Sequence, residues 1–129
     1  MIKVWDYLKE YEELREEVLS EIDGVFKSGT LVFGPKTTEF EDKFSTYCDS
    51  KFGLGVSCGT DALYVAMMAL GIGDGDEVIT VSNTAVPTCT AIAMTGAIPV
   101  FVEIDKYSLM DTSKLGKVIT SKTKAIIPV

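Results

Sequence analysis

The spacing of apolar side chains predicts two helices in the first 50 residues. From residue 6 to residue 28, apolar side chains recur mostly at intervals of three and four, as on one face of an amphipathic helix. These side chains are Leu8, Tyr11, Leu14, Val18, Ile22, Val25 and Phe26. Gly29 is expected to end this helix. In a second helix, Thr38 and Glu41 have the spacing of a capping box, and the helix is expected to end near Asp49. The side chains predicted to form its buried stripe are Phe40, Phe44 and Tyr47.

After residue 53 the pattern changes to short apolar runs that alternate with helical segments. Strands are expected at 54–57, 77–81, 99–104 and 124–129, and helices at 60–70 and 85–95. Gly71 and Gly96 are expected to stop these two helices, and Thr84 to open the second one. A further short helix is expected with Asp111 or Thr112 as its cap. Near-continuous apolar strands joined by helices are typical of a parallel sheet that is covered on both faces.

The fold class is therefore α/β, a mainly parallel sheet with helices on both faces, preceded by two N-terminal helices. No repeat, low-complexity tract or linker divides the chain. We expect residues 1–129 to form a single domain, of which residues 1–50 are a helical segment. A buried-type strand comes last, without the functional loop that such a strand usually feeds at its carboxyl end, so the domain is expected to be incomplete.

Composition narrows the classes of function. The net charge is −7, which argues against a nucleic acid or an anionic membrane as partner, because both need clustered Lys and Arg. The chain has no histidine, which excludes Ser-His and Cys-His nucleophilic pairs and most zinc sites. The three cysteines, Cys48, Cys58 and Cys89, are typical of free thiols in a reducing compartment. Without a signal-peptide pattern or an apolar run of about 18 residues, a soluble cytoplasmic protein is expected.

The turn Ser57-Cys58-Gly59-Thr60 follows a predicted strand and opens a predicted helix. The first backbone N–H groups of a helix lack partners within the helix and favour a bound anion. Gly59 would allow a phosphate to approach the backbone closely, and the Thr60 hydroxyl could add a donor. Strand–glycine–helix turns are also common without any ligand, with a threonine as the helix cap. From spacing alone, both interpretations stay open.

Other segments compete with this turn or could extend it. The segment 82–88 also ends a strand and opens a helix, so it is either a second wall of the same pocket or a capped helix start. Glu103 and Asp105 reach the same edge, as ligand contacts or as a solvated strand end. The glycine-rich segment 71–76 follows a helix and precedes a strand, which puts it at the opposite edge and predicts a helix stop and turn. No metal site is predicted, since this segment lacks the ligand spacing of an EF-hand.

A long segment of the chain resembles the N-terminal part of the DegT/DnrJ/EryC1/StrS family. This segment is "SCGTDALYVAMMALGIGDGDEVITVSNTAVPTCTAIAMTGAIPVFVEID". The upstream "FGPKTTEFEDKFSTYC" resembles the family's G-P-x-x-x-x-F-E segment, and "LMDTSKLGKVITSKTKAIIPV" resembles the stretch that leads to the strand before its H-x-Y-G loop. The resemblance implies a pyridoxal-phosphate-dependent aminotransferase of fold type I that acts on nucleotide-linked keto sugars. It also implies part of the large domain, a homodimer to which the first helices contribute, and glutamate as the usual amino donor.

The resemblance also implies roles for particular residues. Gly59 and Thr60 match the positions that hold the phosphate of pyridoxal 5'-phosphate. Ala85 falls where many members carry an aromatic side chain that stacks on the cofactor ring, and methyl groups of Ala85 and Val86 could cover that face instead. The lysine that forms the Schiff base is expected beyond Val129, so no catalytic residue is predicted within this chain and the chain alone is expected to be inactive.

The same resemblance bears on the segment 54–57 and on two other functions. In such enzymes the first strand lies at one edge of the sheet, and later strands separate it from the next three. Residues 54–57 would then have no neighbouring strand here. One alternative is a non-catalytic, truncated α/β module that binds an anion or a partner chain. Another is a different fold-type I enzyme, such as a desulfurase or an amino-acid transaminase, against which the G-P-x-x-x-x-F-E segment argues.

Overall fold

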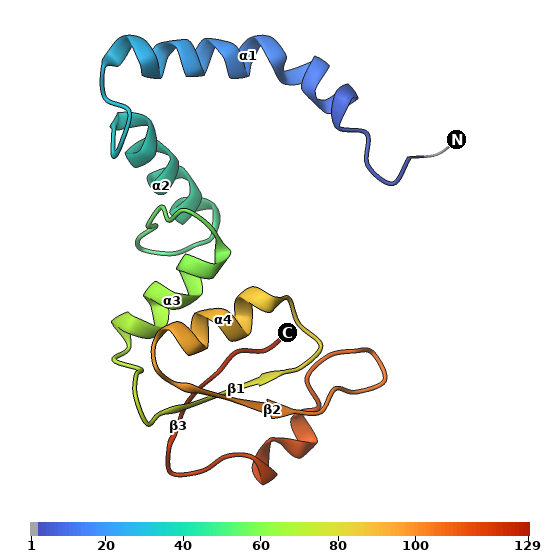
Figure 1. The fold of residues 1–129 in the computed structure, drawn as a ribbon. Coiled ribbons are helices and arrows are strands. Elements are labelled where there is room, and N and C mark those ends of the chain that lie inside the picture. Colours follow the sequence, from blue (N-terminus) through green and yellow to red (C-terminus); the bar gives the residue numbers. More distant parts are fainter. Residues whose placement is uncertain (1–2) are drawn as a thin grey trace. The chain divides into compact units, whose positions relative to one another are not determined.

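The computed structural model describes residues 3–129, which form two compact units. The first unit ends at Gly55 and contains two helices, and the second begins at Val56 and contains a sheet with helices. Figure 1 labels these elements along the chain. No helix within residues 3–129 combines the length and the apolar content needed to cross a bilayer.

The first unit consists of α1 (Tyr7–Ser28) and α2 (Pro35–Tyr47). Helix α1 is the amphipathic helix that the periodicity predicts, and Gly29 ends it in a left-handed conformation with φ 72°. Helix α2 begins four residues earlier than predicted, because its N-cap is Gly34 and not Thr38. Pro35 lies in its first turn, where a backbone N–H has no partner within the helix. The predicted capping box of Thr38 and Glu41 is therefore wrong, because both residues lie inside the helix.

The predicted buried stripe of α2 is also wrong for this chain. Phe40, Phe44 and Tyr47 are 60%, 52% and 86% exposed. Their rings form a row, with centroids 5.5 Å apart between Phe40 and Phe44 and 6.4 Å apart between Phe44 and Tyr47. Helical periodicity indicates which face of a helix is apolar, but it does not indicate what covers that face. Within residues 3–55, nothing covers this row of rings.

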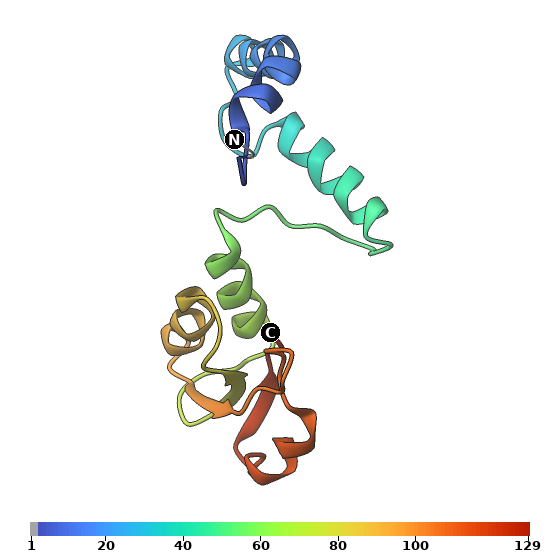
Figure 2. The same ribbon diagram turned by 90° about the vertical axis from the view of Figure 1, so that its right-hand side faces the viewer.

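The second unit is an α/β layer structure. Its elements are α3 (Gly59–Ala69), β1 (Glu77–Val81), α4 (Val86–Met94), β2 (Ile98–Val102), the 3₁₀-helix η1 (Thr112–Lys117) and β3 (Thr123–Ile126). The strand order is β2-β1-β3, and β1 is parallel to both neighbours. Helices α3 and α4 lie on one face of the sheet and η1 on the other, as Figures 1 and 2 show from two directions. This arrangement confirms the predicted fold class.

The central strand β1 supplies the core of both layers. Val78 packs with residues of α3 and α4, whereas Ile79 and Val81 pack with the η1 side, and all three are fully buried. Side chains that alternate between two covered faces explain why the strand reads as a continuous apolar run. The hydroxyl of the buried Thr80 donates a hydrogen bond to the carbonyl oxygen of Ile127 over 3.1 Å. The one polar side chain of this strand's buried part is therefore satisfied.

The strand predicted at 54–57 is not formed, because residues 52–56 have no regular secondary structure. A strand needs a neighbour that pairs with its backbone groups, and β1, β2 and β3 pair only with one another among the described residues. This outcome agrees with the position at a distant sheet edge that the family resemblance implies.

The strand β1 has the predicted bounds, whereas the ends of α3, α4, β2 and β3 differ from prediction by one to three residues. Thr84 does not cap α4, because Ala85 occupies the N-cap position. Asp111 does cap the next short helix, and its side chain accepts a hydrogen bond from the Ser113 backbone N–H, although the helix is of the 3₁₀ type. The strand β2 ends earlier than predicted, because the chain beyond it forms a loop that is closed by an antiparallel bridge between Ile104 and Met110.

Candidate functional site

Helix α3 begins without a side-chain cap. Cys58 is its N-cap residue, in extended conformation with φ −163° and ψ 174°, and no side-chain oxygen caps the first turn. The first intrahelical bond of the backbone runs from Ala62 N–H to Cys58 C=O over 3.0 Å. Thr60 lies inside the first turn, so its interpretation as the helix cap is wrong. The N–H groups of Gly59, Thr60 and Asp61 therefore have no acceptor in the helix and can bind an anion.

The space around Gly59 is open. A Cβ atom built on Gly59 would meet no other atom within 4 Å, and the residue does not have a positive φ. Neither packing nor backbone conformation within the described residues requires glycine here. The missing side chain leaves room for another group to approach the backbone here.

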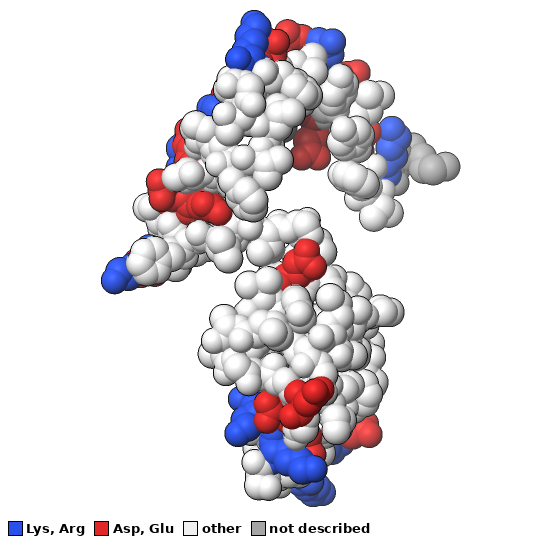
Figure 3. Space-filling view, turned by 60° about the vertical axis from the view of Figure 1, so that its left-hand side comes forward, with Lys and Arg blue, Asp and Glu red and all other residues white. Residues whose placement is uncertain are grey.

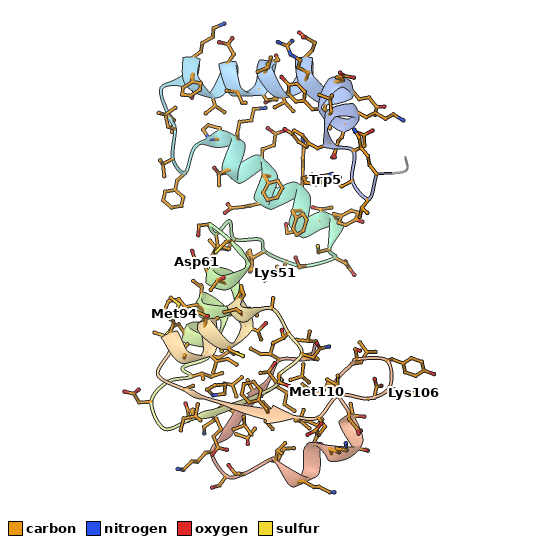
Figure 4. All side chains as sticks on the ribbon, turned by 45° about the vertical axis from the view of Figure 1, so that its right-hand side comes forward. Trp5, Lys51, Asp61, Met94, Lys106 and Met110 are labelled. Carbon is orange, nitrogen blue, oxygen red and sulfur yellow. The ribbon has the colours of Figure 1, made fainter. Side chains whose placement is uncertain are left out.

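The groups around the turn favour negative charge. The pKa of the exposed Cys58 thiol is lowered, first because the Asp61 backbone N–H faces the sulfur, and then because the hydroxyls of Ser57 and Thr60 do. The same backbone N–H groups and the Thr60 hydroxyl could donate to a phosphate oxygen. The Asp61 carboxylate is directed to the Ser57 hydroxyl, with which it forms a hydrogen bond. Figure 4 labels Asp61 in the first turn of α3.

Basic side chains do not contribute to this turn within the second unit. Its lysines all lie between residues 106 and 124, and it has no arginine. On the face drawn in Figure 3, the basic atoms of this unit gather at one end. Binding of an anion at α3 within this unit would therefore rest on backbone N–H groups, hydroxyls and the helix dipole.

The segment 82–88 lies at the same edge of the sheet as this turn. Helices α3 and α4 pack against the same face, and each runs antiparallel to β1, so both begin beyond the carboxyl end of that strand (Figure 1). Ala85 is exposed. The Thr84 and Thr88 hydroxyl oxygens are 2.8 Å apart, and the buried Thr88 donates its backbone N–H to the Ala85 carbonyl. These two bonds fix the backbone on both sides of Ala85.

The carboxylate of Asp105, after β2, has a structural role within its own loop. The Asp105 side chain accepts hydrogen bonds from the backbone N–H groups of Tyr107 and Leu109, over 2.8 and 3.1 Å. It therefore closes the loop that carries Lys106, labelled in Figure 4. The Glu103 carbonyl accepts the Asp111 N–H in the same loop. Among residues 3–129, no cluster of side chains has the composition of a metal site.

The glycine-rich segment 71–76 is a helix stop and turn, as predicted. Gly71 and Gly75 have positive φ values of 73° and 86°. The Asp76 carboxylate accepts the Gly73 N–H over 3.0 Å, which closes the turn. Because the segment joins the end of α3 to the start of β1, it lies at the edge opposite to the α3 N-terminus.

The second unit is a doubly wound α/β structure, and the N-terminus of α3, which has no side-chain cap, lies beyond the carboxyl end of β1. The sequence profile of the DegT/DnrJ/EryC1/StrS aminotransferase family matches residues 12–129, and the chain belongs to this family. This result confirms the family to which the sequence motifs point.

Three comparisons illustrate the relationship. The chain is 45% identical over 127 residues to a dTDP-3-amino-3,4,6-trideoxy-alpha-D-glucose transaminase of Micromonospora megalomicea subsp. nigra, covering 98% of this chain and 34% of that relative. It superimposes on S. venezuelae DesV in complex with a ketimine intermediate with a TM-score of 0.92 and 41% identity, over 95% of this chain and 33% of that one.

For the PMP-form of the putative sugar aminotransferase Spr1654 of Streptococcus pneumoniae, the TM-score is 0.83 at 37% identity, over 85% of this chain and 28% of that one. The chain spans about a third of the length of these proteins.

Proposed function

We propose that residues 1–129 are the N-terminal part of a pyridoxal-phosphate-dependent aminotransferase. The reaction would move an amino group from an amino acid, glutamate being the family's usual donor, to a nucleotide-linked keto sugar. Membership of the family and the relative named as a dTDP-sugar transaminase support this proposal. The observation that carries it is the N-terminus of α3, which is uncapped and open at Gly59.

The residues present fit the phosphate of this cofactor. The backbone N–H groups of Gly59 and Thr60 and the Thr60 hydroxyl would bind the phosphate oxygens, and the open space at Gly59 admits them. The methyl groups of Ala85 and Val86 would lie against the cofactor ring, with less stacking energy than an aromatic side chain. When bound, pyridoxal 5'-phosphate supplies the electron sink of the reaction, and these residues bind and orient it.

The proposal includes a homodimer and a cytoplasmic location. The exposed apolar faces of α1 and α2 support the dimer, because an isolated unit with so many uncovered aromatic rings has surface suited to a partner. The three cysteines are free, as expected in a reducing compartment. The lysine that carries the amino-transfer chemistry is expected in the remaining two thirds of such an enzyme, so residues 1–129 are proposed to bind the phosphate without catalysing the reaction.

Thr60→Val tests the phosphate site in the intact protein, by which we mean the whole enzyme of which residues 1–129 are proposed to be a part. The substitution removes the hydroxyl and keeps the shape, and Kd for pyridoxal 5'-phosphate is expected to rise about tenfold, since a hydrogen bond to a charged group is worth roughly 1.5–3 kcal/mol. Thr90→Val is the matched control, because that hydroxyl bonds to its own helix at Val86. Titrations followed by cofactor absorbance give both values. Equal Kd values for wild type and Thr60→Val would contradict the assignment.

The alternative function, a truncated module that binds an anion or a partner without catalysis, uses the same turn. A measurement of amino transfer distinguishes the aminotransferase from the non-catalytic module. An intact protein that binds pyridoxal 5'-phosphate but does not convert it to the amino form with any amino acid would favour the module.

A further inference from the structure

Glu41, in the F-E pair of the G-P-x-x-x-x-F-E segment, forms a hydrogen bond from α2 to the backbone of a later segment. Its Oε1 accepts the backbone N–H of Gly55 over 2.7 Å, between residues 14 positions apart. The side chain is half-buried in the first unit. The proposed cofactor site does not use this motif, and the sequence predicts only helix capping for Glu41, which the structure excludes.

Two glycines allow this contact. A Cβ atom on Gly53 would lie 2.8 Å from the backbone oxygen of Glu41, a distance that the fixed helix backbone cannot relieve. A Cβ atom on Gly55 would lie 3.3 Å from Glu41 Oε1 and 3.7 Å from Thr37 Cγ2. Neither Gly53 nor Gly55 has a positive φ, so glycine is required at these positions by the close approach to α2 and not by the backbone conformation. The segment is therefore shaped to lie against Glu41.

The bond matters because Gly55 stands just before the turn at Gly59. Residues 52–56 have no regular secondary structure to hold them, and Gly55 lies four positions before Gly59 along the chain. We propose that Glu41 is a positioning residue for the cofactor-phosphate turn, which it serves by fixing the backbone at Gly55. An ordered backbone just before a binding turn reduces the conformational entropy that this segment would lose when a ligand binds. The inference rests on the proposed function of Gly59 and Thr60.

The test compares Glu41→Ala, which removes the acceptor, with Glu41→Gln, which keeps an amide oxygen in its place. Hydrogen exchange of the Gly55 amide in the intact protein reports the bond, and absorbance titration reports Kd for pyridoxal 5'-phosphate. Glu41→Ala is expected to speed the exchange and to raise Kd about three- to tenfold, whereas Glu41→Gln stays near wild type. Asp42→Ala is the matched control, because it removes the same charge from an exposed neighbour on α2 and should change neither value.

Gly53→Ala gives a second variant that leaves Glu41 in place. Its Cβ should push the segment away from α2 and reproduce both effects of Glu41→Ala. Hydrogen exchange in the wild-type protein also tests the bond between Glu41 and Gly55. A Gly55 amide that exchanges at the rate of an unprotected amide would overturn the inference. Faster exchange in Glu41→Ala with an unchanged Kd would overturn it as well. If Thr60→Val also leaves Kd unchanged, the proposed phosphate site itself fails, which distinguishes the two proposals.

Discussion

Replacing Gly59 with alanine separates an anion site from a simple turn. In a simple turn the glycine serves the fold, and its replacement costs stability. In an anion site it leaves room for the ligand, and its replacement costs affinity. The structure provides the condition that makes the test clean, because an added Cβ meets nothing within 4 Å and φ is not positive.

The stability of the protein should not fall in Gly59→Ala. Residue 59 is the first residue of α3, and alanine at a position whose backbone conformation it can adopt stabilises a protein by about 0.4–1 kcal/mol. The affinity should fall, because Cα–Cβ bonds of a helix tilt toward its N-terminus and the new methyl group would point to the phosphate. A loss of about 1.4–2.8 kcal/mol, the order of one or two phosphate hydrogen bonds, raises Kd about 10- to 100-fold.

Urea denaturation and titration with pyridoxal 5'-phosphate measure the two quantities in the intact protein. Gly24→Ala is the control, since Gly24 lies within α1, has open space around it and should gain about 1 kcal/mol of helix stability without any change in Kd. A Gly59→Ala protein that is less stable than wild type and binds the cofactor equally well would refute the reasoning, because glycine would then serve the turn and not the ligand.

Two further predictions concern the second unit. Gly96→Ala should lower the free energy of unfolding by about 1–2 kcal/mol in urea denaturation, because φ is +85° and the exposed Asp74 carboxylate, whose Oδ1 would lie 2.0 Å from the new Cβ, must also move. Gly116→Ala, with open space around it, should change this free energy by less than about 0.5 kcal/mol. Alkylation of Cys58 by iodoacetamide should reach half its maximal rate at a lower pH than alkylation of an ordinary thiol, because the pKa of Cys58 is lowered. Saturating pyridoxal 5'-phosphate should slow the alkylation of Cys58, while the exposed Cys48 reacts at an unchanged rate. Equal alkylation rates at Cys58 with and without the cofactor would contradict the proposed phosphate site.

The sequence predicts those elements whose partners lie close along the chain. Periodicity locates α1 and β1 because each pattern is local and, for β1, both covering layers are present. It fails for the strand at 54–57 and for the buried stripe that includes Phe44, since within residues 3–129 no strand pairs with the former and no element covers the latter. Helix starts are also hard to predict, because a proline in the first turn competes with the capping-box spacing at Thr38.

The candidate site shows why the sequence alone could not choose between a cap and an anion site. Glycines occur in this chain for different physical reasons. Gly29, Gly71, Gly75 and Gly96 have positive φ values, and Gly53 lies against the backbone of α2. Gly24, Gly59 and Gly116 satisfy neither condition within the described residues. Of these three, Gly59 is the one at an uncapped helix N-terminus beyond the carboxyl end of β1. A glycine that the fold does not need, placed where backbone N–H groups are unpaired, is what a phosphate-binding turn requires.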